Sequence, residues 1–265
     1  MQRILSDLHL YDARSRVREL EQLEPLLAGV QTLVLNGDTC EMRRGLAPAQ
    51  LARLKQEFRT RVPEVVFLTG NHDPDISDTH EWFAAGGRVW VTHGDVCFDD
   101  LTPWSRHARE IRREIAAELA RDPGADYVQL AVRYRIARHV ARSEREVPDL
   151  VTRGWGAHLR WVWRTFFPPT QVLAMFRCWR NLPRRAAELA RTQRPSAQVV
   201  VTGHVHFPGV WPVAHGLTVI NTGSFFRPLG GHLVDVEDDR VLVRRIERRG
   251  KFFQAGRMVA EIHLR

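Results

Sequence analysis

Five short apolar runs in this chain each end in a loop that carries Asp, Asn or His. The runs cover residues 4–5, 32–35, 65–68, 88–91 and 198–201. An apolar run of this kind, bounded by polar and glycine-bearing turns, is typical of a buried β-strand. Amphipathic segments at residues 17–27 and 48–61 separate the first three runs and predict helices. Strand and helix alternation of this kind predicts parallel strands joined by right-handed crossovers.

The polar residues that follow these runs are those that ligate metals. They are Asp7 and His9, then Asp38, then Asn71, His72 and Asp73, then His93, and finally His204 and His206. The carboxyl ends of strands in an α/β sheet form one crevice, so these residues are expected to converge. So many imidazoles and carboxylates cannot be buried together without a compensating cation. Their mixed nitrogen and oxygen atoms favour Mn, Fe or Zn over Mg or Ca.

The remaining chain divides into a helical block and a β-rich end. Residues 101–196 carry no strand pattern and predict helices near 103–121, 125–146, 150–166 and 170–191. After residue 201, strands are predicted near 210–213, 217–220, 232–236, 241–246 and 258–264. The predicted fold class is therefore α/β, with two facing sheets, helices outside them and a helical insert. The predicted domains are residues 1–100 plus 197–265, and an insert at 101–196, which we call the cap.

Charge is concentrated in the cap. The chain of 265 residues has a formal net charge of +8, but residues 101–196 alone hold 19 arginines and 9 acidic residues, a net of +10. The other residues therefore carry −2. A basic block of this kind predicts a phosphate-bearing partner, which could be a nucleic acid, an anionic lipid or a phosphorylated small molecule.

The order of the polar motifs resembles the calcineurin-like metallophosphoesterases, whose motifs run D-x-H, G-D, G-N-H-[DE], H and G-H-x-H. All five motifs are present here in that order, and they cover about two-thirds of the chain, leaving out the cap. The resemblance implies the four-layer α/β/β/α sandwich of that superfamily. Each motif alone is common, but the five together are specific.

The resemblance also implies roles for individual residues. One metal would be held by Asp7, His9 and His206, and the other by Asn71, His93 and His204. Asp38 would bridge the two ions, Mn being the first expectation and Fe or Zn the alternatives.

Catalytic roles follow for the two residues after Asn71. His72 would stabilise the phosphoryl oxygens or protonate the leaving group, and Asp73 would orient His72. A loop-capping role before Pro74 is the alternative for Asp73. The expected reaction is hydrolysis of a phosphodiester or pyrophosphate by a hydroxide that bridges the two metals.

Within the superfamily the chain is most similar to the UDP-2,3-diacylglucosamine pyrophosphatases of lipid A synthesis. The similarity rests on residues 6–10, on residues 37–41, on His93-Gly94-Asp95 with the later Asp99-Asp100, and on the helical insert. It implies a lipid-linked substrate such as UDP-2,3-diacylglucosamine. The chain departs from that family at His72, where the family has Arg.

The cap gives a separate argument about the substrate. Trp, Phe and Leu recur at helical spacing in residues 155–180, edged by arginines that are candidates for binding the substrate. These arginines are Arg160, Arg164, Arg177 and Arg180. Such a face suits a membrane interface or an acyl chain beside a diphosphate. Packing on the core and binding of single-stranded nucleic acid remain alternatives, the second because stacking and phosphate contacts use the same residues.

The cysteines and the N-terminus bear on the compartment. Cys40, Cys97 and Cys178 lie far apart, and the first residues read as a strand, so we expect a cytoplasmic protein that could associate with the inner face of a membrane. The expected partner is a phosphorylated small molecule or lipid, ahead of nucleic acid. Besides a nuclease or nucleotide phosphodiesterase, a non-catalytic scaffold with the same fold is an alternative function.

Overall fold

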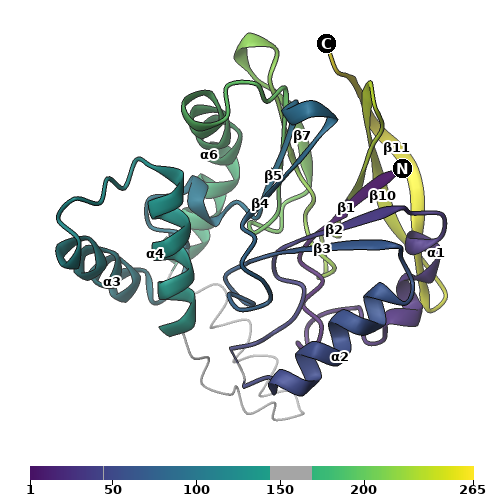
Figure 1. The fold of residues 1–265 in the computed structure, drawn as a ribbon, viewed down its shortest axis with the longest axis horizontal. Coiled ribbons are helices and arrows are strands. Elements are labelled where there is room, and N and C mark those ends of the chain that lie inside the picture. The colour runs from purple at the N-terminus through teal and green to yellow at the C-terminus, as the bar shows by residue number, and fades with distance from the viewer. Residues whose placement is uncertain (44, 144–168) are drawn as a thin grey trace.

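The computed structural model describes residues 1–43, 45–143 and 169–265, and contains two facing β-sheets with helices on their outer sides (Figure 1). The six-stranded sheet has the order β11-β10-β9-β1-β2-β3 and the five-stranded sheet the order β4-β5-β6-β8-β7. The strands of the first sheet are β1 (Gln2–Leu5), β2 (Thr32–Asn36), β3 (Glu64–Leu68), β9 (His232–Val236), β10 (Arg240–Arg249) and β11 (Phe252–His263). Those of the second are β4 (Glu81–Ala84), β5 (Val89–Thr92), β6 (Val199–Thr202), β7 (Gly209–Pro212) and β8 (Thr218–Asn221). The described α-helices are α1 (Glu24–Leu27), α2 (Pro48–Arg59), α3 (Ala108–Arg121), α4 (Leu130–Ser143) and α6 (Pro169–Gln193).

Strand alternation divides the apolar residues into three layers. Successive side chains of a strand point to opposite faces, so Ile4 packs between the two sheets while Leu5 packs on the outer side of the first. In the second sheet, Val91 faces inward and Trp90 faces outward, where it packs with Leu182 of α6. Residues of α2 such as Phe58 cover the outer face of the first sheet. The four layers expected from the sequence are confirmed.

The five predicted core strands all form, but they are divided between the sheets. β1, β2 and β3 pair in parallel in the first sheet, and β5 and β6 pair in parallel in the second. Because the sheets face each other, the carboxyl ends of both groups still meet at one edge. The site is therefore built from two sheets rather than from one.

Two local expectations need correction. The helix predicted over residues 17–27 is reduced to a 3₁₀ turn at Leu20–Leu23 and the single turn of α1. Pro25 lies in the first turn of α1, where its missing N–H breaks a continuous helix. Strand β4 was not predicted, because it has only four residues and lies half-exposed at the edge of its sheet.

The helices of the cap pack on the second sheet. They lie in sequence between β5 and β6, which are neighbours in that sheet. Tyr134 of α4 and Leu182 of α6 belong to the same apolar cluster as Trp90. The predicted domain boundaries stay a prediction, and the helix predicted near 150–166 lies outside the described residues. Among the described residues, no helix is long and apolar enough to cross a membrane.

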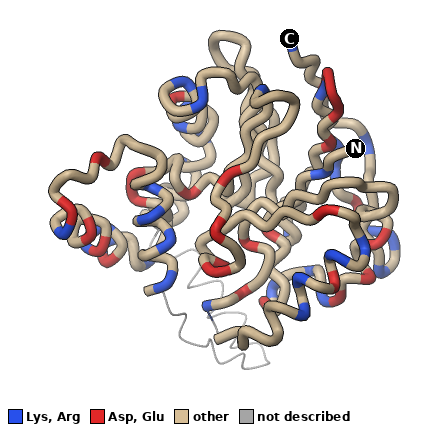
Figure 2. The backbone as a smooth tube through the Cα atoms, in the orientation of Figure 1, with Lys and Arg blue, Asp and Glu red and all other residues tan. Residues whose placement is uncertain are grey.

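Part of the cap's positive charge is neutralised by the body of the protein. Figure 2 shows basic residues along α4 and acidic residues on the loops beside it. Arg138 donates to Asp78 at 2.7 Å and Arg142 to Asp75 at 2.9 Å, so two arginines of α4 are held by the loop that follows β3. Arg194 of the cap is likewise paired with Glu81. The net charge of the cap therefore overstates the charge that is left for a partner.

The layer between the sheets makes a direct prediction about stability. Val34→Ala removes two methyl groups from a fully buried position and is expected to destabilise the protein by about 1–3 kcal/mol. The same change at Val259, which is 40% exposed on β11, should cost less than about 0.5 kcal/mol. Urea unfolding of both variants measures the difference, and equal losses would contradict the assignment of the layers.

Candidate metal centre

The seven predicted ligands come together where the strands of the two sheets end. Pairing between β1 and β2 continues into their loops, because the Asp7 N–H donates to the Gly37 carbonyl at 3.1 Å and the His9 N–H to the Asp38 carbonyl at 2.9 Å. Leu8, between the first two ligands, points the other way into the apolar layer under α2. Leu5 and Leu8 pack in the same layer although they are three residues apart, so strand alternation does not continue past β1, and the positive φ angles of Asp7 and His9 turn these side chains toward the cluster.

The backbone of these loops adopts a conformation that side chains disfavour. Five of the predicted ligands have positive φ angles, between 48° and 69°. They are Asp7, His9, Asp38, His204 and His206. Non-glycine residues rarely adopt such angles, and where they do the surrounding structure has to hold them. The loops are thus shaped for the position of the side chains rather than for relaxed turns.

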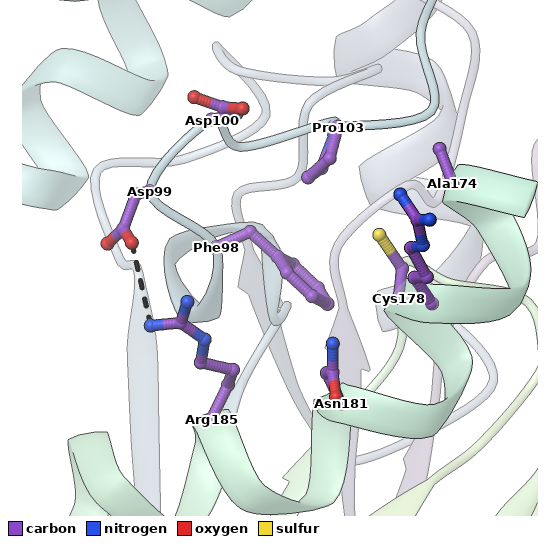
Figure 3. Close-up of a pocket in the computed structure, with 9 residues that line it drawn as sticks. Phe98, Asp99, Asp100, Pro103, Ala174, Cys178, Asn181 and Arg185 are labelled. Atoms are coloured by element: carbon purple, nitrogen blue, oxygen red, sulfur yellow. Dashed lines mark ion pairs between the residues drawn. The ribbon is translucent and has the colours of Figure 1, made fainter. Parts of the chain in front are cut away.

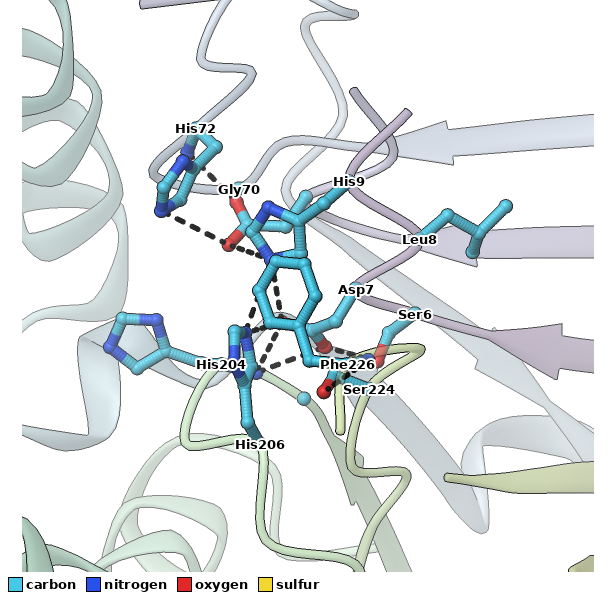
Figure 4. A network of polar contacts seen from close by, with 12 residues as sticks. Ser6, Asp7, Leu8, His9, Gly70, His72, His204, His206, Ser224 and Phe226 are labelled. Atoms are coloured by element: carbon cyan, nitrogen blue, oxygen red, sulfur yellow. Dashed lines mark hydrogen bonds and ion pairs between the residues drawn. The ribbon is translucent and has the colours of Figure 1, made fainter. Parts of the chain in front are cut away.

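The first group of ligand atoms surrounds the end of β1. His206 Nε2 lies 3.0 Å from Asp7 Oδ1 and 3.1 Å from His9 Nε2. His9 Nε2 lies 3.6 Å from Asp38 Oδ2. The four residues can direct one atom each to a common point. Figure 4 shows Asp7, His9 and His206 pointing toward one another.

The second group lies on the other side of Asp38. Asn71 Oδ1 is 2.8 Å from His204 Nδ1 and 3.2 Å from His93 Nε2. His93 Nε2 is also 3.5 Å from Asp38 Oδ2. The same Asp38 oxygen therefore stands at nearly equal distances from an imidazole of each group, as a bridging carboxylate would.

These separations fit two divalent metal ions. Ligands bonded at about 2.1 Å around one ion lie roughly 3.0–3.4 Å from one another. In each group the ligand atoms of several residues converge at about that separation, which a shared cation explains. The clustered His and Asp residues thus fit a pair of divalent ions.

Hydrogen bonds from outside the cluster orient two of the imidazoles. His93 Nδ1 lies 3.0 Å from the carbonyl oxygen of Asn36, and His204 Nε2 lies 3.0 Å from that of Leu101. A carbonyl only accepts, so each of these nitrogens donates, and the other nitrogen of each ring, His93 Nε2 and His204 Nδ1, faces the cluster. This is the arrangement that fixes a metal-binding histidine.

Burial and charge set the protonation of the cluster. Burial lowers the pKa of His9 and His204 well below the usual range, which keeps both rings neutral and able to bind a metal. Burial also opposes charge on His93, but the Asp38 carboxylate outweighs it and raises the pKa of His93. Burial likewise acts against ionised Asp38, yet His93 and His72 hold the pKa of Asp38 well below its usual value. A metal at the second group must therefore displace a proton from His93.

Two glycines make room for the cluster. A Cβ on Gly37, which has φ of 76°, would collide with the ring of His93. A Cβ on Gly70 would collide with the Asp38 carboxylate. The G-D and G-N-H motifs thus need glycine because the ligand of another strand occupies the space.

His72 lies at the rim of the cluster and is held by Glu41. His72 Nδ1 lies 2.5 Å from Glu41 Oε2, and His72 Nε2 lies 3.9 Å from Asp38 Oδ2. Burial acts to lower the pKa of His72, but the carboxylates of Asp38 and Glu41 outweigh it and raise that pKa. Glu41 and His72 could also join His9 in holding an ion. Glu41 lies three residues after Asp38 in the sequence, and no motif pointed to its contact with His72.

Asp73 has a different place from the one expected. Its carboxylate accepts backbone N–H groups of Asp38 and Gly70 at 2.9 Å each and of Thr39 at 2.7 Å. The carboxylate that contacts the His72 ring is that of Glu41, so Asp73 does not orient that ring. It instead ties the loop after β3 to the loop after β2, which corresponds to the loop-capping alternative. Burial and the nearby Asp38 raise the pKa of Asp73 to about 7.

An aromatic residue that the sequence did not point to covers the first group. The ring of Phe226 stacks on His9 with centroids 4.6 Å apart, and it meets His206 edge-on at 5.1 Å (Figure 4). Phe226 lies in the loop between β8 and β9. It therefore narrows access to this side of the cluster.

A cavity of about 360 Å³ lies between the loop of residues 98–103 and α6 (Figure 3). Its lining includes Phe98, Asp99, Arg177 and Arg185. The same loop supplies the Leu101 carbonyl that orients His204, so the cavity adjoins the metal cluster. Of the predicted substrate-binding arginines, Arg177 lines this cavity and Arg180 is exposed on α6. Arg160 and Arg164 lie outside the described residues.

Comparison with known proteins establishes the family. The model of the calcineurin-like phosphoesterase family matches residues 3–208, so the chain belongs to that family. No curated protein matches the chain as a whole. The subfamily suggested by the sequence is not established by these matches.

The chain is also similar to solved structures at low identity. A dimetal phosphatase from Danio rerio is 12% identical, with 100% of this chain and 98% of that chain covered and a TM-score of 0.46. A predicted phosphoesterase from Streptococcus pneumoniae is 13% identical, with 99% and 96% covered and a TM-score of 0.41. Vacuolar protein sorting 29 from Cryptosporidium parvum is 13% identical, with 99% and 97% covered and a TM-score of 0.45.

The contact between Glu41 and His72 predicts a change in titration. Glu41→Gln removes a negative charge that stabilises protonated His72, so the pKa of His72 should fall and the ring should lose its proton at a lower pH. Titration of the His72 ring by NMR in the full-length protein measures this shift. Glu57→Gln, on the surface of α2, is the control and should leave the titration unchanged. An unchanged His72 pKa in Glu41→Gln would contradict the contact.

Proposed function

We propose that the protein is a metal-dependent hydrolase that cleaves a phosphodiester or a pyrophosphate. The observation that carries this proposal is the shared position of Asp38 between two complete groups of ligand atoms. Two divalent ions, for which we propose Mn ahead of Fe or Zn, would activate water and polarise the phosphoryl oxygens when bound. Asp7, His9 and His206 would hold one ion, Asn71, His93 and His204 the other.

His72 is suited to protonate the leaving oxygen. Its Nδ1 is engaged by Glu41, so Nε2 is the atom that faces the cluster and can give up a proton. The raised pKa lets the ring keep its proton to higher pH than a free imidazole, as a general acid requires. Arg43, whose Nη2 lies 2.7 Å from both ring nitrogens of His72, acts to lower that pKa, but the two carboxylates outweigh it, and its charge could also stabilise phosphoryl oxygens.

The substrate we propose is lipid-linked, with UDP-2,3-diacylglucosamine as the leading candidate. The cavity beside the cluster combines Phe98 with Arg177, which suits an apolar group next to a phosphate. Leu173 and Phe176 on α6 are 54% and 55% exposed. An exposed apolar face edged by arginine supports contact with the cytoplasmic face of a membrane. Residues 1–100 with 197–265 would form the catalytic body and residues 101–196 the cap that selects this substrate.

The proposed reaction predicts which variants lose phosphodiester hydrolysis. Asp38→Ala and His204→Ala should reduce hydrolysis of bis(4-nitrophenyl) phosphate in the presence of Mn by more than about 100-fold. Mutating a residue that only hydrogen-bonds to a metal ligand already lowers metal affinity or activity by about 10- to 100-fold, and these two residues are ligands themselves. His72→Ala should slow hydrolysis of a phosphoester with an alkyl leaving group by about 10²- to 10⁴-fold without loss of bound metal, because an alkoxide needs a proton to leave and 4-nitrophenolate does not. Elemental analysis of each purified variant separates loss of metal from loss of the acid.

His263→Ala is the matched control for these variants. His263 is exposed at the end of β11, and its removal should change neither metal content nor rate. Unchanged rates in Asp38→Ala and His204→Ala would refute the proposed reaction. A wild-type protein that binds two metals but hydrolyses no phosphoester would favour the scaffold alternative instead.

The substrate class predicts a second result. The protein should hydrolyse UDP-2,3-diacylglucosamine faster than oligonucleotides, and Arg177→Gln should raise KM for the lipid substrate about tenfold, because one charge-assisted hydrogen bond is lost. Arg184→Gln is the control, since Arg184 lies on the same helix and pairs with Glu188. Faster hydrolysis of oligonucleotides would favour the nuclease alternative.

A further inference from the structure

Three arginines outside the cap, Arg16, Arg227 and Arg248, lie close to one another. The guanidinium carbons of Arg16 and Arg248 lie 5.5 Å and 5.8 Å from the ring centroid of Phe253. The backbone N–H of Arg16 donates to the Phe225 carbonyl at 3.3 Å, which brings the loop that carries Arg227 beside Arg16. We call Arg16, Arg227 and Arg248 the rim cluster.

The rim cluster has no carboxylate partner among the described residues. Elsewhere in the body, arginines such as Arg3 and Arg240 pair with Asp235 and Glu237. Within the same described part of the chain, Arg16 Nε is buried and has no hydrogen-bond partner. Burial, with the neighbouring charges of Arg227 and Arg248, lowers the pKa of Arg16. The cluster therefore repels itself and leaves a donor unsatisfied.

The aromatic ring explains only part of this arrangement. A guanidinium over a phenyl ring gains about 0.5–1 kcal/mol at an exposed site, which holds Arg16 and Arg248 near Phe253. It gives neither a counter-charge nor a hydrogen-bond acceptor. A phosphate would give the counter-charge and would accept from the exposed guanidinium groups of Arg227 and Arg248, which can bind phosphate oxygens through paired N–H donors.

The rim cluster is continuous with the metal centre. The Phe225 N–H donates to the carbonyl of Asp7 at 3.2 Å, and the next residue, Phe226, stacks on His9. The guanidinium of Arg14 lies 5.6 Å from the centroid of Phe226. One loop thus joins Arg227 to the ring that covers the metal ligands, while Arg14, beside that ring, is already paired with Asp12.

We propose that the rim cluster binds a phosphate group of the substrate other than the one that is hydrolysed. This inference rests on the proposed function, and it narrows the substrate to esters that carry a second phosphate, such as nucleoside diphosphate derivatives. The second phosphate would lie on the body side of the centre, opposite the cap arginines. Residues Arg16, Arg227 and Arg248 would set its position and so favour such substrates over simple phosphodiesters.

Calorimetry on the full-length, metal-loaded protein tests the site without any need for turnover. The probe is methylenediphosphonate, a diphosphate analogue that cannot be hydrolysed, with orthophosphate as the reference. The triple variant Arg16→Gln, Arg227→Gln, Arg248→Gln should bind the diphosphonate at least about tenfold more weakly and orthophosphate nearly as well as wild type. Arg227→Gln alone should show part of the loss, and because Arg227 is exposed, this variant is expected to fold.

A second triple variant controls for net charge. Arg244→Gln, Arg245→Gln, Arg257→Gln removes the same charge from another part of the β10–β11 ribbon and should leave both affinities unchanged. Equal weakening in the two triple variants would overturn the proposal, since the effect would then be one of overall charge. A lower melting temperature with unchanged diphosphonate affinity would also overturn it, since the cluster would then serve only to hold Phe253.

Kinetics then connect the site to the substrate. In the rim-cluster variant, KM for a nucleoside diphosphate ester should rise about tenfold with kcat unchanged, while KM for bis(4-nitrophenyl) phosphate should not change. Equal changes for both substrates would overturn the assignment to a second phosphate. If no phosphoester is hydrolysed at all, the proposed function fails, but the calorimetry still decides whether the rim cluster binds a diphosphate.

Discussion

The structure depends on one electrostatic constraint, which is that buried imidazoles and carboxylates must share a compensating charge. Asp7, His9, Asp38, His93 and His204 are each at most 4% exposed and point at one another. Without a cation, the ring nitrogens that face the cluster contact mainly other ligand atoms, such as His9 Nε2 and His206 Nε2 at 3.1 Å. Two cations would be held by the same residues and would compensate the buried carboxylates. The positive φ angles of the ligand loops and the glycines at positions 37 and 70 are what this convergence of side chains requires. The loop backbone adopts a disfavoured conformation, and ligands fill the space that a Cβ would occupy at Gly37 and Gly70.

Much of the fold could be predicted because its strands are buried on both faces. A run such as residues 199–201 is apolar at every position, since Val199 and Val201 pack between the sheets and Val200 packs under α6. Such runs need no alternation to be recognised. β4 lies at the edge of its sheet and is partly exposed, so its residues do not form the continuous apolar run that marks a buried strand. The division of the five strands between two sheets could not be predicted for a related reason. The sequence of a buried strand does not indicate which other strand it pairs with.

The residues of the site are likewise of two kinds. Some belong to sequence motifs, and others reach the site only because of the fold. The ligands occupy fixed places in short motifs, so their convergence could be expected. Glu41 contacts His72 across two loops, and Phe226 reaches His9 from a loop more than two hundred residues away. Asp73 shows the opposite error. It stands next to His72 in sequence, yet its two oxygens are fully used by backbone N–H groups. The position of Asp73 next to His72 in the sequence therefore predicted a contact that the folded chain does not make.

Net charge is a poor guide to where this protein can bind an anion, because pairing decides which charges are free. The cap holds most of the arginines, but Arg138, Arg142 and Arg194 are already neutralised by Asp75, Asp78 and Glu81. The body has a negative formal charge, yet Arg16, Arg227 and Arg248 stand together without a carboxylate in the described part of the chain. An anion is attracted by local potential rather than by the total charge of a domain. If the arginine-edged apolar face of α6 and the rim cluster both contact the substrate, as we propose, that substrate carries an apolar group and a second phosphate.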